Sequence, residues 1–183
     1  SFPNAKINLG LNIINKRQDG YHDIESVFYP ISWCDMLEII PSSQLNFQSS
    51  GLCIPGDSEN NLILKAYKLL LAEGFSLEPV SIYLHKKIPM GAGLGGGSAD
   101  GAFALKMLND IFNLKINNTG LEMMASKLGS DCPFFIENQP RFCYGTGTNF
   151  EKIRVDLKNK FIVLVNPQIH ISTAEAYAGV IPN

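Results

Sequence analysis

The chain has 183 residues, of which 45% are hydrophobic and 17% are charged, and its formal net charge is −2. This composition is typical of one globular domain with a substantial core. A slightly acidic chain without a Lys/Arg stripe argues against nucleic-acid binding, and the absence of a long apolar run argues against a membrane span. The four cysteines lack metal-site spacing, which favours reduced thiols and a cytoplasmic location.

The first part of the sequence predicts an antiparallel β unit. Residues 5–14 alternate between apolar and polar side chains, which predicts a strand with one aliphatic face and one polar face. Lys6 and Asn8 lie on the polar face, which could line a cleft. Asp19-Gly20 is typical of a hairpin turn. Two more strands are expected to follow, over 24–33 and 36–40.

Helices dominate the rest of the pattern. Asn60-Asn61 can cap a helix, and Gly74 suits its end. Helices are expected over 62–73, 101–112 and 120–127, and a last helix opens at the capping box 172–175. A short strand is expected over 80–84, and the apolar run 161–165 predicts a buried strand. Strands grouped early and helices later indicate an α+β fold, with an antiparallel or mixed sheet.

A glycine-rich segment between the strand over 80–84 and the helix over 101–112 predicts an anion site. Glycines let backbone N–H groups converge on a ligand, and a helix N-terminus adds unpaired donors and a positive dipole end. A phosphate is the usual anion at such a site. The expected ATP-contacting residues here are Pro89, Met90, Gly91, Ala92, Gly93, Leu94, Gly95, Gly96, Gly97, Ser98 and Ala99.

Other glycine-rich segments fit less well. A flexible linker is disfavoured by Pro89, Leu94 and the apolar helix that follows. Gly91-x-Gly93-x-x-Gly96 matches the dinucleotide fingerprint, but Pro89 interrupts the strand before it and no ribose-binding carboxylate follows at the required place. The Walker A lysine and the protein-kinase motifs are absent from the sequence.

The pattern Pro-x-x-x-Gly-Leu-Gly-x-x-Ser-Ala resembles the GHMP small-molecule kinases. Two further blocks support the resemblance, Pro3 to Leu9 with Asp19-Gly20-Tyr21-His22, and Leu128 to Phe135. The resemblance runs from Pro3 to about Tyr177. It implies a GHMP-kinase N-terminal domain (ribosomal protein S5 domain 2-like) over 1–165. Residues 166–183 would begin a C-terminal ferredoxin-like domain that is otherwise missing, and we expect little turnover from the chain alone.

The resemblance also assigns catalytic residues. Asp131 matches the family's catalytic aspartate, and Lys6 matches its catalytic lysine. A carboxylate can take the proton of an acceptor alcohol while an ammonium offsets charge on the transferring phosphoryl group. Both residues have structural alternatives, because Asp131 could cap a helix and Lys6 could be a solvated strand lysine.

Ligand contacts follow from the same match. The branch it indicates implies ATP-dependent phosphorylation of the 2-hydroxyl of 4-diphosphocytidyl-2-C-methyl-D-erythritol in non-mevalonate isoprenoid synthesis. Mg²⁺ is expected, with Ser98 as a possible contact; the metal ligands and oligomeric state are not predicted. The substrate-lining residues would be Asn8, Tyr21, His22 and Phe28, and Asn61 and Lys86 would contact the adenine end of ATP.

Each of these contacts has a structural alternative. Tyr21 and His22 could be an ordinary half-exposed hairpin pair, Asn61 a helix cap, and Lys86 a surface lysine. Two functions remain as alternatives: another GHMP kinase of the mevalonate or homoserine type, and a nucleotide-binding module without catalysis.

Overall fold

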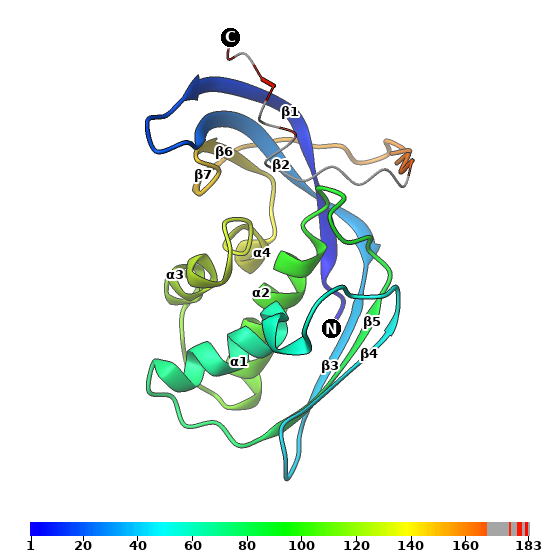
Figure 1. Ribbon diagram of the computed structural model, residues 1–183, viewed down its shortest axis with the longest axis vertical. Coiled ribbons are helices and arrows are strands. Elements are labelled where there is room, and N and C mark those ends of the chain that lie inside the picture. Colours follow the sequence, from blue (N-terminus) through cyan, green and yellow to red (C-terminus); the bar gives the residue numbers. More distant parts are fainter. Residues whose placement is uncertain (168–175, 177–178, 181, 183) are drawn as a thin grey trace.

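The computed structural model describes residues 1–167, 176, 179–180 and 182. Two β-sheets curve around a group of helices, which occupy the inner side of the curve (Figure 1). The strands are β1 (Asn4–Lys16), β2 (His22–Cys34), β3 (Met36–Pro41), β4 (Asn46–Gly51), β5 (Val80–Lys86), β6 (Arg141–Gly145) and β7 (Asn149–Lys152). The helices are η1 (Ser58–Asn60), α1 (Leu62–Ala72), α2 (Gly96–Ile111), α3 (Asn118–Leu128) and α4 (Phe134–Glu137).

The two sheets are joined by a single residue between β2 and β3. One sheet has the order β1-β2-β6-β7 and is antiparallel throughout. The other has the order β3-β5-β4, in which β5 pairs antiparallel with β3 and parallel with β4. Asp35 separates the end of β2 from the start of β3. The predicted α+β class with antiparallel and mixed sheets is therefore confirmed.

The core lies between the β3-β5-β4 sheet and α1 and α2 and continues to α3 and α4. Alternate residues of β3 and β5 face the helices, as expected for a sheet covered on one side. Helix α1 begins as predicted, because the Asn61 side chain accepts a hydrogen bond from the Ile63 amide at 2.9 Å. The largest fully buried apolar side chains are Phe134, Phe135, Leu37, Ile63, Leu70, Ile82, Leu84, Ile88, Leu105, Leu108 and Val80.

Helix α2 begins at Gly96, five residues before the predicted start at Gly101. Glycine has a low helix propensity, so a glycine-rich segment is expected to form a loop. Close packing nevertheless requires glycine at the start of this helix. A Cβ on Gly96 would lie 2.8 Å from Ile88 Cγ2, and one on Gly101 would lie 2.9 Å from Leu62 Cβ. The first turn of the helix is thus made of the glycines that the sequence assigned to the loop.

Three other expectations about the fold need correction. The aliphatic face of β1 is not the buried one: Leu11 is 47% exposed and Lys6 only 5% exposed, because the helices cover only the first residues of the strand. Sequence reasoning also missed β4 and α4 and gave no bounds for β6 and β7, all of which are short.

The third correction concerns residues 161–165, which form no buried strand. Phe161 is 99% exposed, and the described residues supply no partner strand to cover it. The predicted last helix and most of 166–183 lie outside the described residues. The proposed domain division at residue 165 therefore stays a prediction.

Candidate active site

The glycine-rich segment forms an open turn that leads directly into α2. Gly91, Gly93 and Gly95 have φ angles of 70°, 72° and 68°, in the left-handed region that favours glycine. Gly95 precedes the helix without a side-chain cap, so the first-turn amides of α2 face outward unpaired by any capping side chain. Residues 91–93 are exposed. The arrangement is suited to receive an anionic group at the positive end of the helix dipole.

The turn rests directly on Lys6 of β1. The Lys6 amide donates a hydrogen bond to the Leu94 carbonyl at 2.9 Å. A Cβ on Gly95 would lie 3.1 Å from Lys6 Cγ and 2.9 Å from Phe135 Cζ. The absence of a side chain at Gly95 therefore lets the lysine run alongside the loop.

Lys6 and Asp131 meet in space although 125 positions separate them in the sequence. Lys6 Nζ lies 3.5 Å from Asp131 Oδ2, and the two side chains are 6% and 28% exposed. Lys6 Nζ also donates to Asn8 Oδ1 at 2.6 Å and lies 4.2 Å from the centre of the Phe28 ring. The lysine is thus held by groups from two strands, while the carboxylate stays accessible to a substrate.

The segment that carries Asp131 also contacts α2. The Ser98 hydroxyl, in the first turn of α2, lies near the Cys132 thiol and lowers the pKa of that thiol. Burial has the larger effect and raises the pKa of Cys132 to about 11, so the thiol stays protonated. All four cysteines are free thiols. The contact places Asp131 beside the same helix start as the glycine turn.

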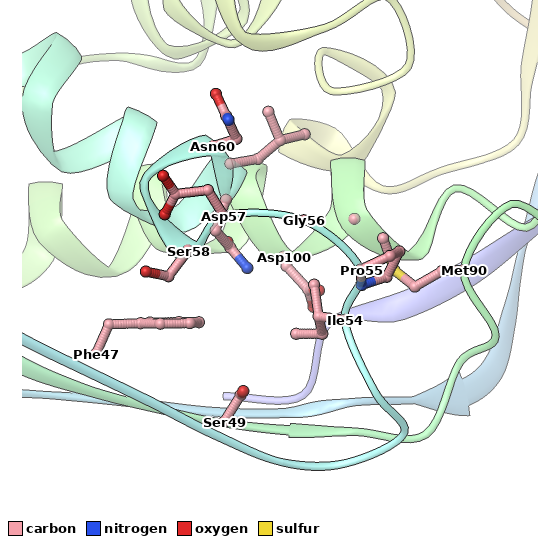
Figure 2. A pocket seen from close by; sticks show the side chains of 13 residues that line it. Phe47, Ser49, Ile54, Pro55, Gly56, Asp57, Ser58, Asn60, Met90 and Asp100 are labelled. Atoms are coloured by element: carbon pink, nitrogen blue, oxygen red, sulfur yellow. The ribbon is translucent and has the colours of Figure 1, made fainter.

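A cavity of about 370 Å³ opens beside this helix start (Figure 2). Phe47 and Ser49 of β4 form one wall, and Asp57 and Ser58 project from the opposite wall. Of the residues predicted to bind ATP, the cavity is lined by Asn61, Met90 and Gly97. Its apolar wall, polar rim and contact with the glycine turn are suited to a nucleotide base.

Lys86 lies beneath the glycine turn, and its side chain is not on the surface. Lys86 Nζ is bound by Asp35 Oδ2 at 2.5 Å and by Asp100 Oδ2 at 2.6 Å, in a group that is almost completely buried. Asp35 Oδ1 accepts hydrogen bonds from the amides of Lys87 and Ile88. The surface-lysine alternative is therefore wrong, because the ammonium is buried between two carboxylates. The predicted contact of Lys86 with adenine stays a prediction.

Asp100 links this buried ion group to the cavity. Burial raises its pKa to about 7, against the attraction of Lys86, and the charge of Asp35 adds to the rise. No described residue forms a hydrogen bond with its buried Oδ1 atom, and Asp100 lines the cavity wall. Sequence reasoning missed Asp100, although its spacing to Ala104 and Leu108 shows a carboxylate on the apolar stripe of α2.

The residues predicted to line the substrate fall into two groups. Asn8 and Phe28 lie beside Lys6, but Phe28 is 3% exposed and packs edge-on against Phe134 and Phe150, so it supports the lysine from the core. Tyr21 and His22 lie at the far end of the β1–β2 hairpin, where His22 pairs with Lys16. Tyr21 is 67% exposed.

The described residues contain no group of three His, Cys, Asp or Glu side chains that could hold a metal ion by themselves. Mg²⁺ usually keeps several waters and binds through one or two protein groups plus substrate phosphates. The Ser98 hydroxyl at the start of α2 suits such a role beside a bound nucleotide.

No helix among the described residues has the length and apolar character needed to cross a bilayer.

Comparison with known proteins identifies the family. Residues 61–145 match the GHMP kinases N terminal domain. The chain is 55% identical to the 4-diphosphocytidyl-2-C-methyl-D-erythritol kinase of Cytophaga hutchinsonii, covering all of this chain and 68% of that protein. It is 50% identical to the enzyme of the same name from Parabacteroides distasonis, covering 99% of this chain and 66% of that protein. The chain thus spans about two thirds of the length of these relatives.

Solved structures give the same result. A crystal structure of 4-(cytidine 5'-diphospho)-2C-methyl-D-erythritol kinase matches with a TM-score of 0.75 and 34% identity, over 85% of this chain and 55% of that chain. The Methanococcus jannaschii mevalonate kinase, at 15% identity and a TM-score of 0.61, over 85% of this chain and 55% of that chain, shares the fold. The chain has the GHMP-kinase N-terminal fold and belongs to the 4-diphosphocytidyl-2-C-methyl-D-erythritol kinase family of GHMP kinases.

Proposed function

We propose that this protein transfers the γ-phosphoryl group of ATP to the 2-hydroxyl of 4-diphosphocytidyl-2-C-methyl-D-erythritol, in the cytoplasm. The observation that carries the proposal is the approach of Lys6 Nζ to Asp131 Oδ2, 3.5 Å apart and beside the glycine turn. Relatives at 50% identity and above bear the name of this kinase. Membership of the family and the placement of these groups support the same reaction.

Each group has a role in the transfer. The acceptor hydroxyl gives its proton to Asp131 as its oxygen forms a bond to the γ-phosphorus, and the bond from that phosphorus to the β,γ-bridging oxygen breaks to release ADP. Lys6 faces the transferring group and offsets its negative charge. The amides of residues 91–97 hold the phosphates, and the cavity beside Asn61 and Met90 holds the base. The Ser98 hydroxyl would help to hold an Mg²⁺ ion that enters with ATP, and that ion would neutralise part of the phosphate charge.

The cytidine end of the acceptor would lie along the β1–β2 hairpin. Tyr21 offers an exposed aromatic face on which a pyrimidine can stack, and His22 offers a ring edge with polar atoms. The hairpin runs from the lysine to these residues, so it can carry an extended acceptor from its reacting alcohol to its base.

A comparison of acceptors tests the proposal. Release of ADP from ATP is measured in the full-length protein with 4-diphosphocytidyl-2-C-methyl-D-erythritol, mevalonate or homoserine as acceptor. We expect turnover with the CDP-linked alcohol alone. Equal turnover with mevalonate or homoserine would support the other GHMP type, and ATP binding without turnover of any acceptor would support the non-catalytic module.

Asp131→Asn tests the proposed base. The amide keeps the size of the side chain but cannot accept the proton, so we expect kcat to fall by about 10²- to 10⁴-fold. ATP affinity and the melting temperature should change little, because the side chain is partly exposed. A variant with an unchanged kcat would show that Asp131 is structural.

A further inference from the structure

A row of hydrogen bonds leads from a bulge in β1 to the ammonium of Lys6. Ser26 Oγ donates to the Gly10 carbonyl at 2.6 Å, Asn8 Nδ2 donates to Ser26 Oγ at 2.9 Å, and Lys6 Nζ donates to Asn8 Oδ1 at 2.6 Å. Ser26 is 3% exposed, so water does not compete readily for its hydroxyl. The three bonds form one connected network that ends beside Asp131.

The direction of every bond in this network is fixed by chemistry. A carbonyl oxygen can only accept, so Ser26 must give its single proton to Gly10 and can then only accept from Asn8. Asn8 therefore presents its NH₂ group to Ser26 and its oxygen to Lys6. The reversed amide would set two donor groups against each other, at the lysine. The hydroxyl of Ser26 thus decides which end of the Asn8 amide meets the ammonium.

The anchor of the network depends on an irregularity of the strand. Leu9 pairs with Val27 and Leu11 with Ser26, so Gly10 is an extra residue in the β1–β2 ladder. Its φ of 71° is unfavourable for a residue with a side chain. The bulge leaves the Gly10 carbonyl within reach of the Ser26 side chain on β2.

We propose that Ser26 is a positioning residue for phosphoryl transfer, because it orients the Asn8 amide that holds the Lys6 ammonium next to Asp131. The inference rests on the proposed function of Lys6. Besides the oxygen of Asn8, the ammonium has only the Asp131 carboxylate at 3.5 Å and the face of Phe28 among its described neighbours. Without the hydroxyl of Ser26, the amide of Asn8 is free to turn and the closest contact of the lysine is lost.

Three substitutions at one position separate the hydroxyl from the shape of the side chain. Ser26→Thr keeps the hydroxyl, Ser26→Val has the shape of threonine without it, and Ser26→Ala removes it with little change in volume. We expect kcat to fall about 10- to 100-fold in the Ala and Val variants, as for the loss of one or two hydrogen bonds. Ser26→Thr should stay within about threefold of the wild type, and the KM for ATP should not change in any variant.

A double-mutant cycle with Asn8→Ala distinguishes positioning from a merely structural effect. If Ser26 acts through Asn8, Ser26→Ala should not lower kcat further in the Asn8→Ala background. Ile24→Ala is the matched control, since Ile24 is also buried in β2, two residues from Ser26, and forms no part of the network. It should lower the melting temperature but not kcat.

The outcomes are distinct. Wild-type kcat in Ser26→Val, equal losses in the Thr and Val variants, or additive losses with Asn8→Ala would each overturn the inference. If Ser26→Ala fails to fold, the Thr and Val pair still decides it. If the wild-type protein itself transfers no phosphoryl group, the proposed function fails. The network is then tested by the exchange of Lys6 Nζ protons with water, which should be at least tenfold faster in Ser26→Val than in Ser26→Thr.

Discussion

Lys6 is a buried cation, and its neighbours do not fully compensate the cost of burying its charge. Its side chain is 6% exposed, and its carboxylate partner lies at 3.5 Å, beyond close hydrogen-bond contact. A buried charge is costly to desolvate, and a loose ion pair does not fully compensate that cost. The position is thus explained better by a reaction that needs an ammonium than by folding.

Lys6→Met should separate activity from stability. The substitution keeps most of the apolar stem and removes the charge, so we expect kcat to fall by about 10²- to 10³-fold. The melting temperature should stay the same or rise, because the desolvation cost of the ammonium disappears. Kinetics and thermal unfolding of the same preparation measure both effects, and a large drop in melting temperature would mean that the ion pair serves the fold.

The buried carboxyl of Asp100 should make stability depend on pH. Its pKa is raised from 3.8 to about 7 by burial, so the folded state holds the proton more tightly than the unfolded state. The corresponding stability is fully present below about pH 4 and is lost as pH rises through about 7. In Asp100→Asn this dependence is removed, because the amide does not titrate.

The measurement compares the two proteins by urea unfolding at pH 5 and pH 8. The free energy of unfolding of the wild type should fall more between these pH values than that of Asp100→Asn. Parallel changes in the two proteins would show that Asp100 does not titrate in this range.

At the level of single residues, sequence motifs predicted Lys6 and Asp131 but not their surroundings. The motifs give residue types at fixed spacing, and catalytic groups are recognised in this way. Ser26, Asp35 and Asp100 lie outside any such motif. Their partners come from other strands and helices, and pairing across such distances in sequence depends on the register of the sheets.

The glycine turn is the element on which the site is built, and its glycines have different physical roles. Gly93 and Gly95 both have a φ near 70°, but a Cβ would meet nothing within 4 Å at Gly93. At Gly95 it would clash with Phe135 and crowd Lys6. Gly93 is therefore required only by the backbone conformation, whereas Gly95 is also required by the close approach of Phe135 and Lys6.

Substitution by alanine should reveal this difference. We expect Gly93→Ala to cost about 1–2 kcal/mol of stability, from backbone strain alone. Gly95→Ala should cost at least about 1 kcal/mol more, because the ring of Phe135 must shift. It should also lower kcat through displacement of Lys6. Thermal unfolding and kinetics measure the pair, and equal losses of stability would contradict the role given to the Phe135 contact.

Periodic elements were predictable from the sequence, and tightly packed or short ones were not. Helix α1 and strands β2, β3 and β5 were found close to their expected positions, since a strong period marks them. Helix α2 was predicted too short, because the low helix propensity of glycine favours a loop where packing in fact produces the first turn of the helix. Strand β4 has few apolar residues and is held by its parallel pairing with β5, a contact that no local pattern reveals.

On the scale of the whole molecule, one hydrophobic core supports both sheets and the site. Helix α2 contacts α1, α3, α4, β1 and β3, and it begins at the glycine turn. Figure 1 shows this helix at the centre, between the two sheets. Packing along α2 therefore fixes the position of the glycine turn relative to both sheets.

Leu105→Ala should destabilise the entire protein. Leu105 is fully buried on α2, and such a truncation costs about 2–5 kcal/mol. Leu71 of α1 is 43% exposed, so Leu71→Ala should cost much less and serves as the control. Urea unfolding followed by the fluorescence of Trp33 and by circular dichroism should give coincident transitions. Separate transitions would mean that the sheets do not share one cooperative core.

The α+β class was predictable because it depends on the order of elements, but the arrangement of the layers was not. Strands β2 and β3 belong to different sheets although only Asp35 separates them, and nothing in the alternation of residues 24–40 marks this change. The prediction of a buried strand over 161–165 was wrong for a related reason. Apolar residues favour burial, but the sequence does not show which surface would cover them.

The main-chain bond from the Lys6 amide to the Leu94 carbonyl ties the strand and the turn into one mechanical unit. A triphosphate that draws the turn inward would carry the lysine with it, and an alcohol that draws the lysine would preset the turn. Linkage then requires each ligand to tighten the other by an equal factor. We expect calorimetric titration of a non-hydrolysable ATP analogue to give a lower Kd when the CDP-linked alcohol is already bound.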